Sequence, residues 1–242
     1  MERALFAAAS GMAAQQRNLD TIADNLANAG VVGFKGSAQS FAELIVPGAG
    51  GLGTVALGPH VLLAQGKLAR SAGPFDLAID GSGFFTLVDA HGRRFYTRDG
   101  QFSRAADGTL RNLHDLRLDG VRIPSDALSA TVAADGSVRA AFAKGSRVIG
   151  HIRLAEFASP EGLRSLDGSL FEATRESGKP REIVPGGDDG PKLRFGMLEE
   201  SNVTIIDAMM QILTAQRAYE ANAKGVQAAD EMLRIANNLQ RG

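Results

Sequence analysis

The chain has no cysteine among its 242 residues. It therefore cannot form disulfides or thiolate metal sites, and an oxidising compartment would be tolerated. Its net charge is −1, from 26 basic and 27 acidic residues, with no block of like charge. This balance gives no electrostatic reason to expect nucleic acid or anionic lipid as a partner. No apolar run approaches the roughly 18 residues that a membrane span requires.

The N-terminus also lacks the features of a secretory signal peptide. Gln15, Gln16 and Arg17 interrupt its Ala-rich stretch, which keeps a helical stripe where a signal peptide has a uniform apolar core. We therefore expect the first residues to remain in the mature protein. A length of 242 residues suffices for one large or two modest domains.

No motif in the chain predicts catalysis or a cofactor. The stretch Gly48–Gly53 matches G-x-G-x-x-G, but the residues after it do not form a helix pattern, so a flexible linker is favoured over a nucleotide site. Gly81-Ser82-Gly83 lacks the first glycine of a nucleophile elbow and is typical of a hairpin turn. The four histidines show no metal-ligand spacing. We therefore predict no enzyme, no cofactor and no metal.

The most informative pattern is a pair of heptad-spaced stripes at the two ends of the chain. Residues 203–240 carry such a stripe in a helix of about 35 residues, with the polar Gln216 and Asp230 in its seam, and residues 4–29 carry a second. Stripes of this period bury themselves only against other helices, so we predict an assembly interface. Its residues are Leu5, Met12, Leu19, Ile22 and Leu26 in the first helix and Met209, Ile212, Gln216, Tyr219, Val226 and Leu233 in the second.

The ends of the two helices have recognisable signals. The first helix should run from about Arg3 to Asn28, with Gly30 in the left-handed conformation that ends helices and Phe34 folding back on the helix. Thr204 and Asp207 form a plausible capping box for the second helix. Spacing alone leaves two alternatives open: the stripes pack within one chain, or they join neighbouring chains.

Between the helices the pattern changes to short β-segments. These are expected at 76–80, 84–88, 93–97, 128–133 and 149–157. Seven Asp-Gly pairs, which suit turns with positive φ, predict a hairpin-rich antiparallel domain; they begin at Asp80, Asp99, Asp107, Asp119, Asp135, Asp167 and Asp189. The Gly-rich stretch 47–58 is typical of a flexible connection.

These observations predict an α+β fold in which long N- and C-terminal helices form a coiled-coil layer beside a central antiparallel β-rich domain. The expected division is a discontinuous assembly domain at 1–40 and 198–242, a linker at 41–66 and a β-rich middle domain at 67–197.

Four ordered motifs resemble the bacterial flagellar rod and hook proteins. They are Asn25-Leu26-Ala27-Asn28-Ala29 closed by Gly33-Phe34-Lys35; Asp76–Phe85; Tyr96–Phe102; and Leu198–Val203 followed by Ala215–Glu220. The chain looks most like a rod protein of the distal or proximal type, being too short for a hook protein. Between Phe41 and Gly66 it lacks the longer insertion usual in distal-rod proteins, so both types stay open.

The resemblance implies a structural subunit whose terminal helices form the inner layer of a tube that transmits torque from motor to hook. Implied partners are other copies of the chain, other axial proteins, the type III export apparatus and an outer-membrane bushing ring, with no nucleic acid or small-molecule substrate. The implied location is the periplasmic rod, reached without cleavage of a signal. The alternative is a self-contained β-domain adapter whose terminal helices pack only on each other.

Overall fold

The computed structural model describes residues 2–46, 50–187 and 190–241. Its contacts divide the chain into two compact units. Unit 1 comprises Met1–Ala29, Ser37–Leu62 and Val203–Gly242, and unit 2 comprises Gly30–Gly36 and Leu63–Asn202. Each unit is therefore built from segments that lie far apart in the sequence.

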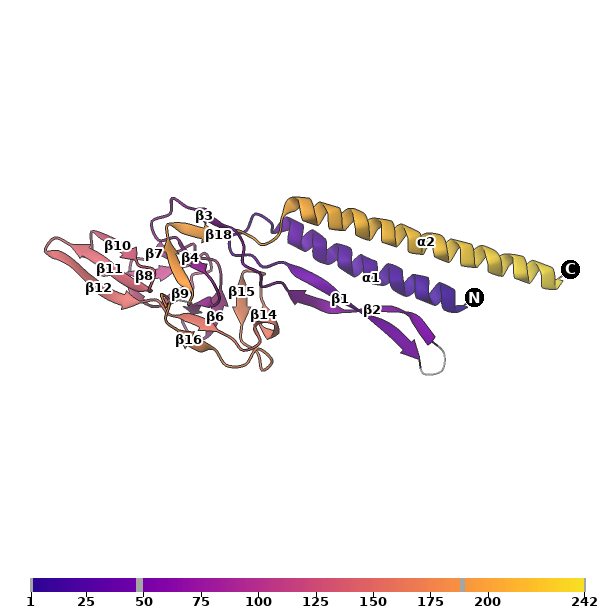
Figure 1. Cartoon of the computed structure of the whole chain (residues 1–242), viewed down its shortest axis with the longest axis horizontal. Coiled ribbons are helices and arrows are strands. Elements are labelled where there is room, and N and C mark those ends of the chain that lie inside the picture. The colour runs from indigo at the N-terminus through magenta and orange to yellow at the C-terminus, as the bar shows by residue number, and fades with distance from the viewer. Residues whose placement is uncertain (1, 47–49, 188–189, 242) are drawn as a thin grey trace. The chain divides into compact units, whose positions relative to one another are not determined.

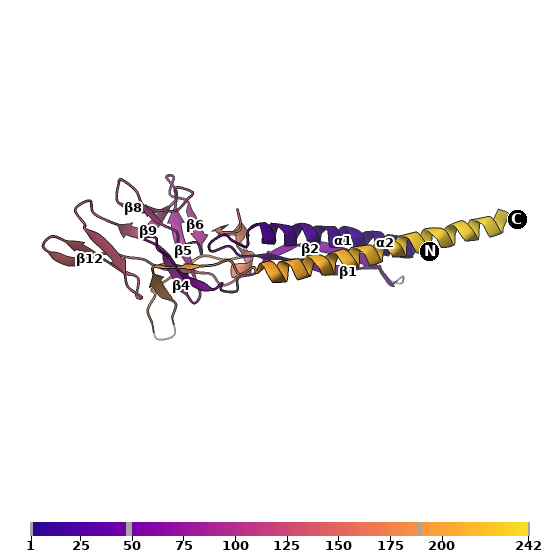
Figure 2. The ribbon, with the colours of Figure 1, turned by 90° about the horizontal axis from the view of Figure 1, so that it is seen from above.

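Two long helices dominate unit 1: α1 (Glu2–Ala27) and α2 (Ile205–Arg241). Ile22 of α1 is buried with Ala208 and Ala215 of α2, whereas Gly11 near the start of α1 lies against Asn222. Later residues of α1 thus meet earlier residues of α2, so the helices pack antiparallel, as Figures 1 and 2 show. Both predicted helices and the α+β fold class are confirmed.

A β-hairpin completes unit 1. Strands β1 (Ser37–Val46) and β2 (Gly50–Val61) pair antiparallel and lie along α1. The sequence predicted a flexible connection over 47–58; residues 50–58 instead belong to β2, and 47–49 lie outside the described residues. Glycine serves close packing here, because a Cβ on Gly53 would fall 2.1 Å from Ser10 Oγ. The same hydroxyl accepts a hydrogen bond from Thr54 N at 3.1 Å.

Unit 2 consists of antiparallel strands. A nine-stranded sheet has the path β14-β15-β6-β5-β9-β8-β7, with β13 on β5 and β16 on β13; β10-β11-β12 form a second sheet, and β4 pairs with β17 and β3 with β18. The strands are β3 (Leu68–Arg70), β4 (Leu77–Asp80), β5 (Phe84–Val88), β6 (Arg94–Thr97), β7 (Ser103–Arg104), β8 (Thr109–Arg111), β9 (Arg117–Arg122), β10 (Ser129–Val132), β11 (Ser137–Phe142), β12 (Gly145–His151), β13 (Leu154–Glu156), β14 (Arg164–Ser165), β15 (Leu170–Glu172), β16 (Arg181–Ile183), β17 (Lys192–Phe195) and β18 (Met197–Glu199), with a short 3₁₀ helix at Pro160–Gly162.

The core of unit 2 is apolar and its strands match the predicted ones closely. Leu77, Ile79, Phe85, Leu87 and Leu154 are among the side chains with no measurable exposure. Four of the five predicted strands correspond to β4, β5, β6 and β10. The fifth, at 149–157, is divided between the end of β12 and β13.

Three of the Asp-Gly turns share one hydrogen-bonding scheme. In Asp107-Gly108-Thr109, Asp135-Gly136-Ser137 and Asp167-Gly168-Ser169 the aspartate Oδ1 accepts from both the backbone N and the hydroxyl of the third residue. The central glycines have φ between 79° and 82°, where a Cβ is disfavoured. The expected turn chemistry is confirmed at these sites, whereas Asp189 lies outside the described residues.

The helix ends show one confirmed signal and two corrections. Thr204 caps α2, because its Oγ1 accepts from Asp207 N at 3.1 Å and its hydroxyl donates to the Asp207 carboxylate at 2.6 Å. Gly30 does not take positive φ; Gly33 does, at 66°. Phe34 was expected on the N-terminal helix, but its ring lies against Gly168 within unit 2, where a Cβ would fall 2.2 Å from the ring.

Candidate functional site

Three of the predicted interface residues of α1 lie at its contact with α2. Ile22 is buried, and Leu19 and Leu26 pack against the cluster that it forms with Ala208 and Ala215. Leu5 and Met12 are half-buried. The second half of the α1 stripe, Leu19 to Leu26, therefore packs within the chain.

The α2 residues that face α1 differ in part from the predicted seam. Ile212, Val226 and Leu233 are half-buried as the stripe predicts, but the buried column beside them is Ala208, Ala215 and Ala229. Gln216 is exposed, as is Asp230, so within the described chain neither lies in a buried seam. Asn222 is a polar side chain at the helix contact, next to Gly11. Small side chains let the two helices approach closely.

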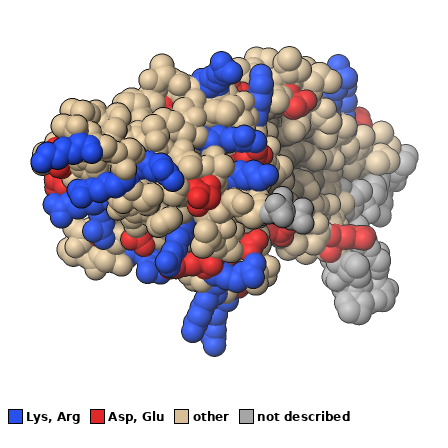
Figure 3. Space-filling view, turned by 60° about the vertical axis from the view of Figure 1, so that its left-hand side comes forward, with Lys and Arg blue, Asp and Glu red and all other residues tan. Residues whose placement is uncertain are grey.

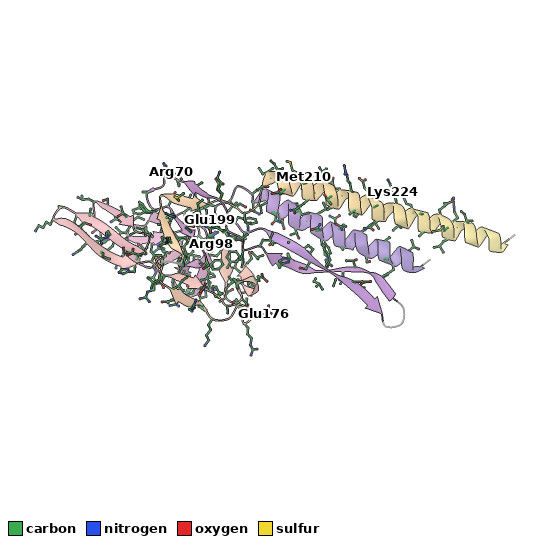
Figure 4. All side chains as sticks on the ribbon, in the orientation of Figure 1. Arg70, Arg98, Glu176, Glu199, Met210 and Lys224 are labelled. Carbon is green, nitrogen blue, oxygen red and sulfur yellow. The ribbon has the colours of Figure 1, made fainter. Side chains whose placement is uncertain are left out.

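The larger apolar residues of α2 remain in solvent. We term Ile205, Ile206, Met209, Met210 and Leu213 the outer apolar row; their exposed fractions lie between 52% and 76%. Figure 4 labels Met210 near the start of α2. Tyr219, farther along the helix, is 38% exposed. Five large apolar side chains exposed within nine residues are typical of an interaction surface.

A buried ion cluster in unit 2 is the second notable site, and sequence reasoning did not find it. We term Lys35, Arg98 and Glu199 the Glu199 cluster. Lys35 Nζ lies 2.5 Å from Glu199 Oε1, and Arg98 Nη1 lies 3.2 Å from Glu199 Oε2. Exposure of the three side chains is 1%, 6% and 0%. Arg98 and Glu199 lie close together in Figure 4.

Backbone groups form hydrogen bonds with all three side chains of this cluster. Lys35 Nζ donates to Ala64 O at 2.8 Å, Gly66 N donates to Glu199 Oε1 at 2.9 Å, and Arg98 Nη2 donates to Gly81 O at 2.9 Å. Burial lowers the pKa of Lys35, and the Glu199 carboxylate opposes that shift. Arg98 Nε is buried without a partner among the described residues. The cluster therefore carries two cations and one carboxylate in a buried site.

The backbone around the cluster is packed too tightly for any side chain on several glycines. A Cβ on Gly33 would fall 2.3 Å from Asp99 N, one on Gly66 1.9 Å from Glu200 O, and one on Gly100 1.6 Å from Leu77 O. Gly33 N also donates to Glu199 O at 2.7 Å. The parts of the four motifs that belong to unit 2 thus meet around Glu199.

Two asparagines of the motifs clamp backbone in the same way. In unit 1 the Asn25 side chain bonds both backbone groups of Ser37, donating to its O at 2.7 Å and accepting from its N at 2.8 Å. In unit 2 Asn202 accepts from Gly36 N at 2.9 Å and donates to Ala64 O at 3.1 Å. The polar residues of these motifs are therefore structural.

Metal sites and membrane-spanning helices were not found among the described residues. No group of three or more His, Asp or Glu among them is arranged to hold a metal ion. No described helix is long and apolar enough to cross a membrane. On the face shown in Figure 3, Lys and Arg side chains are interspersed with Asp and Glu, as the balanced composition predicts.

Comparison with known proteins agrees with this arrangement. Residues 5–35 match the family described as flagella basal body rod protein, 78–140 the D1 domain of flagellar hook protein FlgE/F/G, and 195–239 the C-terminal region of flagellar basal body rod FlgEFG protein. The FlgG proteins of Borreliella burgdorferi and Agrobacterium fabrum are 37% and 35% identical, covering 100% and 97% of this chain and 100% and 98% of theirs. FlgF of Mesorhizobium japonicum is 32% identical over 92% of this chain and 91% of its own.

The chain belongs to the flagellar basal-body rod protein family, a structural and non-enzymatic family. Within it, the chain is a FlgG-like structural subunit of the rod.

Proposed function

We propose that this subunit self-assembles through α1 and α2 into the helical tube that transmits torque from motor to hook. The observation that supports this most is the outer apolar row, which single chains leave in solvent. A helical tube needs heterologous contacts, in which one patch meets a different patch on the next copy. An α2 helix with one apolar face on α1 and a second face exposed meets that need.

The proposed interface keeps the residues expected from sequence and gives them two tasks. Those between α1 and α2, such as Ile22, Leu26 and Ile212, hold the helix pair together in each subunit. Those in solvent, such as Met209 and Tyr219, contact neighbouring subunits. Gln216 is exposed beside this second group, where its amide can hydrogen-bond across the contact and select the register.

A groove between the helices supports contact with neighbouring side chains. It has a volume of about 330 Å³ and is lined mainly by apolar surface, with Ile22, Met210, Ala215 and Ala218 among its residues. An apolar side chain from a second copy would fill this groove in the way that knobs fill holes between packed helices.

Partners and location follow from the family. We propose contacts with other copies of the chain and with other rod and hook subunits, export by the flagellar type III apparatus without a cleaved signal, and contact of unit 2 with the outer-membrane bushing ring. A basal-body rod subunit would act in the periplasm.

The test is electron microscopy of basal bodies from cells whose copy lacks residues 203–242, together with swimming assays. We expect loss of part or all of the rod and loss of motility. Circular dichroism of the purified truncated protein is the control, because unit 2 retains all its strands. Intact rods and normal swimming would instead favour the adapter function, in which the α1–α2 contact serves only the single chain.

A further inference from the structure

The Glu199 cluster unites residues from opposite ends of the chain. Lys35 comes from the segment that follows α1, whereas Glu199 ends β18, 164 residues later. Arg98 follows β6 in the middle of unit 2. Glu199 is the only carboxylate that forms an ion pair with either cation among the described residues.

Without Glu199 the two cations would repel each other. Arg98 and Lys35 interact unfavourably even in the closed unit, and both are almost fully removed from water. Two uncompensated cations in such a site are strongly disfavoured. Folding of unit 2 with Lys35 and Arg98 buried therefore requires the carboxylate that β18 carries.

The strand pairing imposes the same requirement independently. β3 pairs only with β18, and β4 pairs only with β17, among the described strands. β4 contributes Leu77 and Ile79 to the core, both with no measurable exposure. Without residues 192–199, these two strands have no partner and their side chains lose one wall of the core.

We propose that Glu199 is a latch for folding: unit 2 folds only when β18 brings this carboxylate between Lys35 and Arg98. A chain that lacks its C-terminal part, through truncation or incomplete synthesis, then cannot present a folded unit 2. Only chains that include Glu199 therefore fold unit 2, and this requirement does not depend on how the helices assemble.

Glu199 differs from an ordinary core residue because its negative charge, and not the shape of its side chain, stabilises unit 2. Glu199→Gln keeps the shape of the side chain and an acceptor for Gly66 N, but removes the negative charge. Breaking a buried ion pair in this way should shift the unfolding equilibrium of unit 2 by roughly 100- to 1,000-fold. Glu200→Gln is the matched control, since Glu200 is exposed and adjacent.

The experiment uses full-length protein and follows unit 2 by urea unfolding and by hydrogen exchange of the Leu77–Ile79 amides. We expect Glu199→Gln to lower the urea midpoint and to reduce exchange protection in β4 by roughly 100- to 1,000-fold, and Glu200→Gln to behave as wild type. An all-neutral variant, with Lys35→Met, Arg98→Met and Glu199→Gln, should regain at least tenfold of the lost equilibrium constant. The latch is wrong if Glu199→Gln matches wild type, or if the all-neutral variant is no more stable than Glu199→Gln.

Discussion

Met210 offers the sharpest test of the outer apolar row. Its side chain is 61% exposed and lies at the rim of the groove between α2 and α1. Met210→Asp therefore removes little packing from the single chain and places its charge in water. The cost to the free subunit is mainly reduced helix propensity, about 0.5 kcal/mol, and the urea midpoint should change little.

The same substitution has a much larger effect in an assembled rod. Full burial of a Met side chain is worth about 1.5–3 kcal/mol, so covering the exposed part of Met210 is worth roughly 1–2 kcal/mol. An unpaired carboxylate in that contact costs several kcal/mol more. A loss of about 3 kcal/mol or more weakens each subunit contact over 100-fold, and the contact recurs along the tube.

The assay combines swimming, electron microscopy of basal bodies and urea unfolding of the purified subunit. We expect Met210→Asp cells to be non-motile with short or absent rods, while the purified protein unfolds at nearly the wild-type midpoint. Met210→Leu is the matched control and should retain rods. Ala215→Asp should instead lower the urea midpoint of the purified protein, because Ala215 is 2% exposed at the contact with α1. Normal rods with Met210→Asp would refute the assignment of this face to assembly.

Three further predictions concern single positions. Gly100→Ala should lower the urea midpoint of unit 2, because its Cβ would lie 1.6 Å from Leu77 O, whereas Gly30→Ala should be harmless, since no atom lies within 4 Å of its Cβ. Burial raises the pKa of Asp99 to about 6, above its unfolded value of about 3.9. The stability associated with its protonated form is thus present below about pH 4 and lost as pH rises through 6. Asp99→Asn should therefore stabilise unit 2 at pH 8, by up to about 3 kcal/mol, with little effect at pH 4 in pH-dependent urea titrations. Leu19→Asp should abolish rod assembly while circular dichroism and hydrogen exchange show unit 2 still folded, because the charge falls in the packed contact of unit 1.

Local patterns were sufficient to predict most elements of the fold. The terminal helices, the cap at Thr204 and four strands of unit 2 follow from periodicity, capping chemistry and Asp-Gly turns, all of which act within a few residues. The β1–β2 hairpin was not predicted, because Gly51 and Gly53 indicate flexibility when read in isolation. Gly53 is required by the approach of α1 to within 2.1 Å of its missing Cβ, a contact across 43 residues that no local pattern contains.

The Glu199 cluster could not be predicted for the same reason. Its ion pairs join residues 164 and 101 positions apart in sequence, and lysine, arginine and glutamate are usually solvated. The motifs around them were visible, but their convergence depends on β3 and β4 pairing with the last two strands. Only the topology of unit 2 shows that the charged residues of three motifs meet in one buried site.

The seam of α2 shows why heptad spacing alone cannot assign a helix face. The column of Ile212, Tyr219, Val226 and Leu233 borders two other columns, and either can accompany it in steps of three and four. The sequence stripe took the column that begins with Met209; the structure places the alanine column that begins with Ala208 against α1. Close packing favours this choice, since small residues meet there: a Cβ on Gly225 of α2 would lie 3.8 Å from the Cβ of Ala8 on α1. Met209 then stays exposed with the rest of the outer apolar row. A solitary adapter has no reason to leave these apolar side chains in solvent, and this favours assembly over the adapter.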